Sequence, residues 1–233
     1  LQREKERMTK LQYAQEYLGE FIDELMQLFP TELIKERMTL EPNKEKNIDS
    51  KFALGVDVAR YGGDQSTYVV VEKTTDNIIN IKECLISENM STTHIIGQIK
   101  KLNEEWGFIK IYIDDGGLGA SILDILLEDD DIKRKIEGIN NSKKSIEYDA
   151  DKKKPNSRRV MKEDIYSNLL SLMERKQINL TKDPELYRSL CSVQYEFTSE
   201  GRTKIFGNYT HICEGLVRAC WCIKDKSLNI YIY

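Results

Sequence analysis

Three acidic residues lie inside or at the end of regular sequence patterns, and they are the residues most able to support chemistry. Asp57 lies within an apolar strand-like run, Asp114 ends a second such run, and Glu214 lies in a late helical pattern. A carboxylate inside a buried strand is costly unless its charge is compensated, and a divalent metal ion compensates it well. Two cations held about 3.5–4 Å apart by converging carboxylates would support phosphoryl chemistry.

Two of these carboxylates also have a purely structural interpretation. Asp57 could accept hydrogen bonds within a turn instead of binding a metal ion. Glu214 and Arg218 are four residues apart in the expected helix, so they could form an ordinary helix salt bridge. The sequence leaves both alternatives open.

Further residues are candidates for the same site. Strand alternation favours Asp114 over its neighbour Asp115 as a metal ligand, but Asp115 remains an alternative. Asp64, in the turn after the first strand, could add a fourth carboxylate. His211 precedes Glu214 by three residues and therefore shares its helix face, either as a group that acts in the site or as a polar residue satisfied by its neighbours.

The elements that must position these residues alternate in type along the chain. Runs at 52–59, 67–73 and 78–86, separated by turn residues, predict a three-stranded meander. The later pattern predicts helices at 92–105, 118–128, 158–175 and 211–223, strands at 108–113 and 136–139, and a hairpin over 192–197 and 203–206. This order indicates the α/β class, with a mixed central β-sheet and helices on both faces.

The N-terminal part differs from the rest of the chain. Residues 1–28 have apolar positions at helical spacing, and residues 41–50 are polar and read as a linker. We therefore expect a helical linker segment over 1–50 and one α/β domain over 51–233. Because the first residue is Leu and not Met, we also expect that partner domains lie outside this chain.

The composition is that of an ordinary soluble globular protein. Of the 233 residues, 40% are hydrophobic and 32% are charged, and no apolar run approaches the roughly 20 residues of a membrane span. No membrane partner and no export are expected, because the start of the chain lacks a secretory signal. The five cysteines are scattered without the paired spacing of a zinc site, so they are interpreted as reduced core residues.

Positive charge is concentrated in one region although the formal net charge is −4. The stretch from residue 133 to 162 holds eleven basic residues against four acidic ones. Such a stretch is a candidate for contacting a phosphate backbone, and the alternative is a solvated loop. The residues proposed to make such contacts are Lys143, Lys144, Lys152, Lys153, Lys154, Arg158 and Arg159.

Three motifs resemble those of one known family. They are Gly-Val-Asp-Val-Ala-Arg at 55–60 followed by Gly-Asp at 63–64, Asp-Asp-Gly-Gly-Leu-Gly-Ala at 114–120, and Gln-Glu-Tyr-Leu-Gly-Glu-Phe at 15–21. Together they are similar to the C-terminal nuclease domain of the large terminase subunit of tailed bacteriophages, which has a ribonuclease H-like fold. A fourth motif of the family, in its final helix, is not matched fully. The family usually has Asp-Ala-Leu there, and this chain has Glu-Gly-Leu at 214–216.

The resemblance implies a metal-dependent endonuclease that cuts double-stranded viral DNA during genome packaging. It implies that Asp57, Asp114 and Glu214 hold two Mg²⁺ or Mn²⁺ ions. From its position one turn before Glu214, His211 is a further candidate catalytic group. The implied partners are double-stranded DNA, the motor ATPase domain of the same protein, the small terminase subunit and the capsid portal, in the host cell cytoplasm. The chain has no Gly-x-x-x-x-Gly-Lys-Ser/Thr motif, so no ATP hydrolysis is expected of it.

Two other functions remain as alternatives. One is a catalytically weak DNA clamp or interaction module that keeps this fold without the metal site. The Glu at position 214 and the acidic net charge favour this alternative. The other is a phosphotransferase of the actin or sugar-kinase type, whose first strand also presents an Asp near glycines. That class needs a duplicated domain, of which the chain holds one copy.

Overall fold

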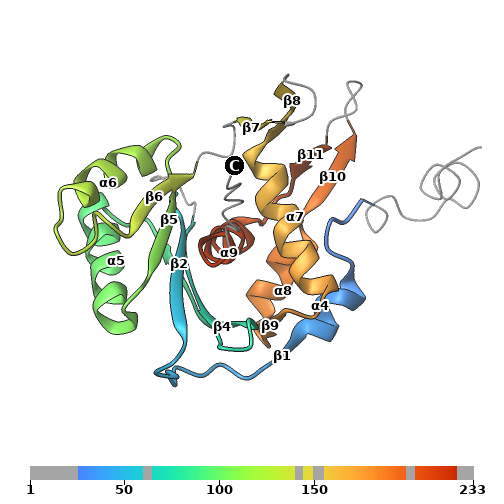
Figure 1. Cartoon of the computed structure of the whole chain (residues 1–233), viewed down its shortest axis with the longest axis horizontal. Helices are drawn as coiled ribbons and strands as arrows, with labels where there is room; N and C mark the ends of the chain where they lie inside the picture. The colour runs from blue at the N-terminus through green and yellow to red at the C-terminus, as the bar shows by residue number, and fades with distance from the viewer. Residues whose placement is uncertain (1–25, 60–64, 140–143, 149–154, 198–202, 225–233) are drawn as a thin grey trace, which may run out of the picture.

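The computed structural model of the chain describes residues 26–59, 65–139, 144–148, 155–197 and 203–224. Among these residues, a central sheet of seven strands has the order β1-β9-β4-β3-β2-β5-β6 (Figure 1). Its strands are β1 (Met38–Leu40), β2 (Lys51–Asp57), β3 (Gln65–Lys73), β4 (Ile79–Glu88), β5 (Lys110–Asp114), β6 (Ile136–Ile139) and β9 (Ile178–Thr181).

The sheet is mixed, as the sequence predicts. Strands β2, β3 and β4 pair antiparallel and form the expected meander. On one side β5 pairs parallel to β2, and β6 pairs parallel to β5. On the other side β9 pairs parallel to β4, and β1 pairs parallel to β9. The antiparallel meander therefore lies at the centre of the sheet, between parallel strands on both sides.

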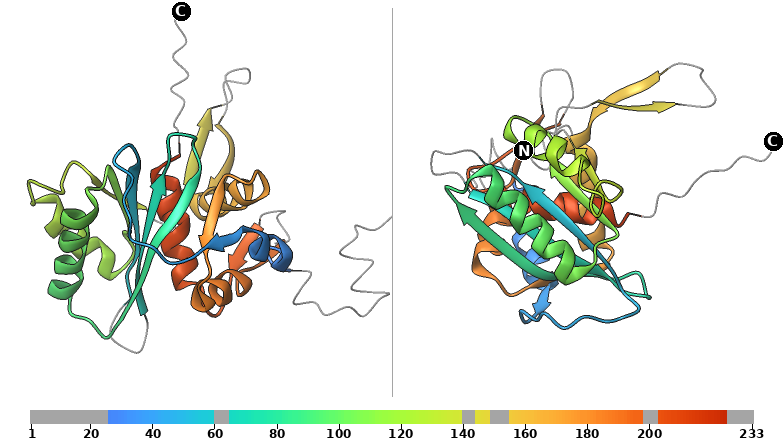
Figure 2. Two further views of the ribbon diagram at one scale, coloured as in Figure 1. Left: turned by 90° about the horizontal axis from the view of Figure 1, so that it is seen from below. Right: turned by 90° about the vertical axis from the view of Figure 1, so that its left-hand side faces the viewer.

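Helices cover both faces of the sheet (Figures 1 and 2). One face carries α5 (Thr92–Trp106) and α6 (Leu118–Leu127), and the other carries α4 (Thr31–Arg37), α7 (Met161–Glu174), α8 (Pro184–Cys191) and α9 (His211–Cys222). Strand alternation divides the core accordingly. Leu54 packs in the cluster that includes Ile95 of α5, whereas Ala53 packs in the cluster that includes Leu216 of α9. Both faces of β2 are buried, which explains its continuous apolar run.

Two hairpins lie outside the sheet. The first pairs β10 (Gln194–Phe197) with β11 (Thr203–Phe206), as predicted. The second pairs β7 (Lys144–Tyr148) with β8 (Pro155–Val160) and extends away from the body (Figure 2). The helix predicted over 158–175 was wrong at its start, because α7 begins at Met161 and the preceding residues pair with β7. Hydrophobic spacing within one segment does not reveal such a partner.

Residues 26–40, within the segment predicted as a helical linker, are part of the fold. Residues 1–25, which hold most of the predicted first helix, lie outside the described residues, and Gln27 forms a β-bridge with Gln194 instead of a helical turn. Phe29 and Ile34 are fully buried in the core, and β1 joins the sheet through β9. Residues 41–50 contain no regular element, and Lys44 in this segment forms an ion pair with Glu83 of β4.

The cysteines were expected to be reduced core residues, and their burial agrees for two of the five. All five cysteines are free thiols; Cys213 and Cys220 are fully buried, and the other three are partly exposed. Within the described ranges, no helix has the length and apolar character that crossing a membrane requires.

Helix α9 crosses β2 at a point where both backbones carry glycine. A Cβ atom added to Gly55 would lie 2.0 Å from the backbone oxygen of Gly215 and 2.4 Å from the backbone nitrogen of Ala219. A Cβ added to Gly215 would lie 2.9 Å from a methyl carbon of Val69. These distances are too short for real contacts, so only glycine allows the helix to approach the strand this closely. The contact places the first two turns of α9 beside the end of β2.

Gly55→Ala is expected to lower the free energy of unfolding by at least about 1–3 kcal/mol, the usual cost of overpacking a core. The added methyl group collides with backbone atoms, which cannot rotate away as a side chain can. Chemical unfolding of the variant measures this cost. Gly97→Ala is the matched control, because Gly97 lies in α5 with open space around it. That substitution is expected to be neutral or stabilising, and equal losses at the two positions would refute the explanation.

Candidate functional site

Strand alternation turns Asp57 and Asp114 toward α9. Gly55 of β2 faces α9, so Asp57, two residues further along, faces the same side. In β5, Ile113 packs in the core on the opposite face, so Asp114 faces α9 as well. Val56 pairs with Ile113 in the parallel register, and the two aspartates therefore follow at the same edge of the sheet.

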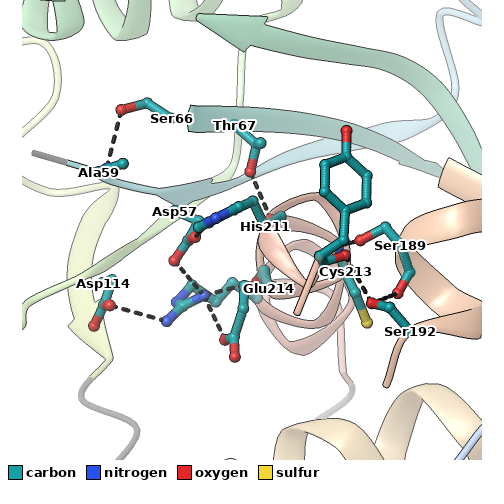
Figure 3. A network of polar contacts seen from close by, with 12 residues as sticks. Asp57, Ala59, Ser66, Thr67, Asp114, Ser189, Ser192, His211, Cys213 and Glu214 are labelled. Atoms are coloured by element: carbon teal, nitrogen blue, oxygen red, sulfur yellow. Dashed lines mark hydrogen bonds and ion pairs between the residues drawn. The ribbon is translucent and has the colours of Figure 1, made fainter. Parts of the chain in front are cut away.

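Asp57, Asp114 and Glu214 point toward one another (Figure 3). The side chain of Arg218 contacts all three carboxylates. Its Nη1 atom is 3.3 Å from Oδ1 of Asp57 and 3.0 Å from Oε2 of Glu214. Its Nη2 atom is 3.4 Å from Oδ2 of Asp114. Nη1 also donates a hydrogen bond to the backbone oxygen of Glu214 at 2.8 Å. Arg218 has 0% exposure, so it bridges the acidic residues from within the protein.

The second oxygen of each carboxylate contacts another group of the chain. Oδ2 of Asp57 is 3.2 Å from Nδ1 of His211. Oδ1 of Asp114 accepts a hydrogen bond of 3.2 Å from the backbone N–H of Gly116.

The remaining oxygen belongs to Glu214, and two side chains of α7 reach it. Tyr166 donates its hydroxyl hydrogen to Oε1 of Glu214 at 2.7 Å, and the ammonium of Lys162 lies 3.1 Å from the same atom. All six carboxylate oxygens of the cluster therefore contact a nitrogen or hydroxyl group of the chain.

The electrostatics of the cluster follow from burial and from these contacts. Burial by itself would lower the pKa of Arg218, but the carboxylates of Glu214, Asp57 and Asp114 outweigh it and raise the pKa above its usual value. Burial raises the pKa of Asp114, and the neighbouring Arg218 opposes that shift. The pKa of Tyr166 is also raised, chiefly by burial, so its hydroxyl stays protonated and donates to Glu214. The cluster is thus acidic and largely neutralised from within.

The structure brings four of the predicted site residues together and separates others. Asp57, Asp114, Glu214 and His211 form one cluster. Asp115 does not join it: a Cβ added to Gly138 of β6 would lie 2.7 Å from the Cβ of Asp115, which places this residue beside β6.

Some of the other predicted residues lie outside the described residues, and the rest lie on the β7–β8 hairpin. Asp64, Lys143 and the lysines at 152–154 are outside the described residues. Lys144 lies on β7, and Arg158 and Arg159 lie on β8.

Sequence reasoning missed part of this site. The spacing of Glu214 and Arg218 predicted their pairing but not that the same guanidinium reaches both aspartates. Tyr166 carries no sequence signal for its role, because its partner Glu214 is 48 residues away. Lys162 was recognised only as one of many basic residues.

The donor types of the cluster fit a hard divalent cation. Carboxylate oxygens are the ligands that Mg²⁺ and Ca²⁺ prefer. The guanidinium of Arg218 nevertheless occupies the point on which Asp57, Asp114 and Glu214 converge. Within the part of the chain that is described, no group of three or more His, Cys, Asp and Glu side chains is arranged to hold a metal ion.

Tyr166→Phe is expected to lower the free energy of unfolding by about 1.5–3 kcal/mol, because it removes a buried hydrogen bond to a charged group. Tyr209→Phe is the matched control. It removes a hydrogen bond of the same length, 2.7 Å, to the more exposed carboxylate of Glu185, and its expected cost is about 0.5–1.5 kcal/mol. Urea unfolding of both variants gives the comparison, and a larger loss for Tyr209→Phe would contradict the importance of the buried bond.

Comparisons with known proteins agree with this fold. No protein-family model matches the chain. The chain is similar to the curated large terminase subunits of Thermus virus P23-45 and Thermus phage G20c. Each is 25% identical over 201 residues, which cover 82% of this chain and 36% of the relative. The chain thus spans about a third of the length of the curated relatives that it matches.

Solved structures extend this likeness to three dimensions. The large terminase nuclease of thermophilic phage G20c with bound magnesium has a TM-score of 0.63 at 19% identity, covering 84% of this chain and 97% of that chain. The nuclease domain of the large terminase of Thermus phage P74-26 has a TM-score of 0.58 at 18% identity, covering 83% and 93%. A mutant nuclease domain of the large terminase subunit of bacterial virus Sf6, with manganese and beta-thujaplicinol, has a TM-score of 0.62 at 14% identity, covering 84% of this chain and 98% of that chain.

These findings define the class of the protein. The described domain is a ribonuclease H-like α/β domain with acidic residues at the edge of its central sheet. More narrowly, the chain resembles the nuclease domain of large terminase subunits in both sequence and fold, which confirms the resemblance that its motifs indicated.

Proposed function

We propose that this chain is a metal-dependent endonuclease domain of a phage large terminase subunit and cleaves double-stranded DNA during genome packaging. The observation that carries the proposal is the convergence of Asp57, Asp114 and Glu214 in a domain with the fold of terminase nucleases. Gathering three carboxylates with little exposure costs free energy, because their charges are desolvated and repel one another. A function that uses their charge accounts for them.

The proposed ligands of two divalent cations, Mg²⁺ or Mn²⁺, are Asp57, Asp114 and Glu214. Bound cations would supply an activated water and neutralise the charge that develops on the phosphate. The chain supplies the remaining functions. His211, whose side chain is one third exposed, contacts Asp57 and orients its carboxylate. Lys162 and Tyr166 fix the carboxylate of Glu214 through its other oxygen. Asp64 and Asp115 are the further candidate ligands that the sequence raised.

The β7–β8 hairpin is the proposed contact to the DNA backbone. Strand β8 ends at Val160, two residues before Lys162, whose ammonium contacts Glu214. The end of β8 is therefore close in the chain to a residue that contacts the acidic cluster. The proposed contacts are Lys143, Lys144, Lys152, Lys153, Lys154, Arg158 and Arg159. Contacts of this type bind phosphates without reading bases, so binding should weaken steeply as salt rises.

The remaining partners follow from the same proposal. A terminase nuclease would act with the motor ATPase domain of its own protein, the small terminase subunit and the capsid portal, in the cytoplasm of the host cell.

Cleavage of supercoiled plasmid tests the function. The chain is incubated with plasmid in Mn²⁺, Mg²⁺ or EDTA, beside Asp57→Asn and the control Asp76→Asn. Asp76 is exposed in the turn between β3 and β4, at the opposite end of the sheet. We expect cation-dependent nicking and linearisation by the wild type and by Asp76→Asn, and none by Asp57→Asn. Equal cleavage by both variants would exclude the proposed site.

A second candidate function is a DNA clamp of the same fold without catalysis. The observation that favours it is the position of Arg218, which neutralises the carboxylates as a structural ion network would. A clamp predicts DNA binding that is the same in EDTA and in Mn²⁺, with no cleavage in either. The plasmid assay combined with a DNA-binding titration therefore separates the two candidates.

A further inference from the structure

Arg218 provides internally the charge compensation that a bound cation would provide. Three carboxylates with little exposure contact its guanidinium, and no part of Arg218 is exposed. Buried carboxylates require a compensating charge, because their desolvation is otherwise too costly. The metal-free chain therefore has its own means of keeping Asp57, Asp114 and Glu214 together.

The same contacts place the guanidinium in competition with any cation. Each carboxylate uses one oxygen for Arg218 and the other for another group of the chain. A divalent cation at this cluster needs oxygens that Arg218 already contacts, and two cationic groups cannot share them at contact distance without strong repulsion. Binding of the cation and the observed position of the guanidinium are thus mutually unfavourable.

The geometry also gives the guanidinium a contact that it can keep. Nη1 donates to the backbone oxygen of Glu214 at 2.8 Å, one helical turn before Arg218. That bond involves no carboxylate. The side chain can therefore release Asp57 and Asp114 while it remains hydrogen-bonded to its own helix.

We propose that Arg218 is a built-in counter-cation, which holds the three carboxylates in the metal-free protein and is displaced when a divalent cation binds. This inference rests on the proposed function in one respect, namely that the cluster binds divalent cations. Arg218 acts through the carboxylates and is in this sense a positioning residue. Its displacement opposes cation binding and so raises the cation concentration at which the site fills.

Calorimetric titration of the metal-stripped chain with Mn²⁺ tests the competition. Arg218→Met removes the charge and keeps much of the length, and we expect the dissociation constant for Mn²⁺ to fall by about 5- to 150-fold, the usual range of coupling between two ligands. Arg218→Lys retains a charge and should stay near the wild-type value. Arg188→Met is the control for charge loss at an exposed site and should bind as the wild type does. Binding by Arg218→Met that is no tighter than that of the wild type would overturn the proposal.

Nitrogen NMR of the arginine side chains tests the displacement in the wild type itself. The buried guanidinium should give a slowly exchanging signal, identified by its loss in Arg218→Lys. Saturating Mg²⁺ should shift or broaden that signal, and an unchanged signal with Mg²⁺ bound would refute displacement. If the wild type cleaves DNA but the signal does not move, only this inference fails. If no cation binds to the wild type or to any variant, the proposed function fails with it.

Discussion

Asp114→Asn is expected to lower the rate of DNA cleavage by more than about 100-fold. A loss of about 10- to 100-fold is typical when a group that only supports a metal ligand is removed, and the loss of a ligand should exceed it. Asp114 faces α9 and contacts Arg218, so its carboxylate is part of the cluster. The neutral amide keeps the shape of the side chain but removes the negative charge. Initial rates on plasmid DNA in Mn²⁺ measure the effect.

Asp115→Asn is the matched comparison for this prediction. Asp115 is the adjacent acidic residue, but it lies beside Gly138 of β6, and its Oδ1 atom is buried without a hydrogen-bond partner among the described residues. The amide substitution there is expected to retain most of the cleavage activity. Loss of cleavage in Asp115→Asn with retention in Asp114→Asn would reverse the assignment and make Asp115 the functional carboxylate.

Arg218→Met is expected to lower the free energy of unfolding by about 3–5 kcal/mol in EDTA, the usual cost of breaking a buried ion pair. The substitution leaves Asp57, Asp114 and Glu214 close together without their shared counter-charge. Urea unfolding in EDTA measures the loss, and Arg188→Met, at a largely exposed arginine, is expected to cost no more than about 1 kcal/mol.

A second substitution examines the cause of that loss. Glu214→Gln in the Arg218→Met background removes one of the uncompensated charges, so it should recover part of the lost stability. If the changes in the free energy of unfolding caused by the two substitutions simply add, Glu214 and Arg218 do not interact and the explanation is wrong. A loss below about 1 kcal/mol for Arg218→Met alone would mean that water compensates the carboxylates.

Much of the fold was accessible from local sequence patterns. The meander from β2 to β4 was predicted because apolar runs of strand length were separated by clear turns. The start of α7 was predicted wrongly because residues 155–160 pair with β7 through their backbone, a contact that depends on a second segment. Strand β9, only four residues long, was not predicted at all. Short strands owe their structure to their neighbours in the sheet more than to their own residues.

The sequence predicted which acidic residues belong to the candidate site, but it did not predict how Arg218 connects them. Strand alternation, helix spacing and the family resemblance together pointed to Asp57, Asp114, Glu214 and His211, which the structure brings together. The central position of Arg218 was not accessible, because it depends on how closely α9 approaches β2. That distance is set by Gly55 and Gly215, two residues without side chains whose pairing no periodic pattern reveals.

The close packing of α9 against β2 has a consequence for the order in which the protein matures. Asp57 and Arg218 are 161 residues apart in the chain, so their contact is among the last to form as the polypeptide leaves the ribosome. A nascent chain that has not yet reached residue 211 contains both aspartates but neither Glu214 nor the arginine. The acidic cluster is therefore completed only after the rest of the sheet has been synthesised, and a prematurely terminated chain would carry no assembled site.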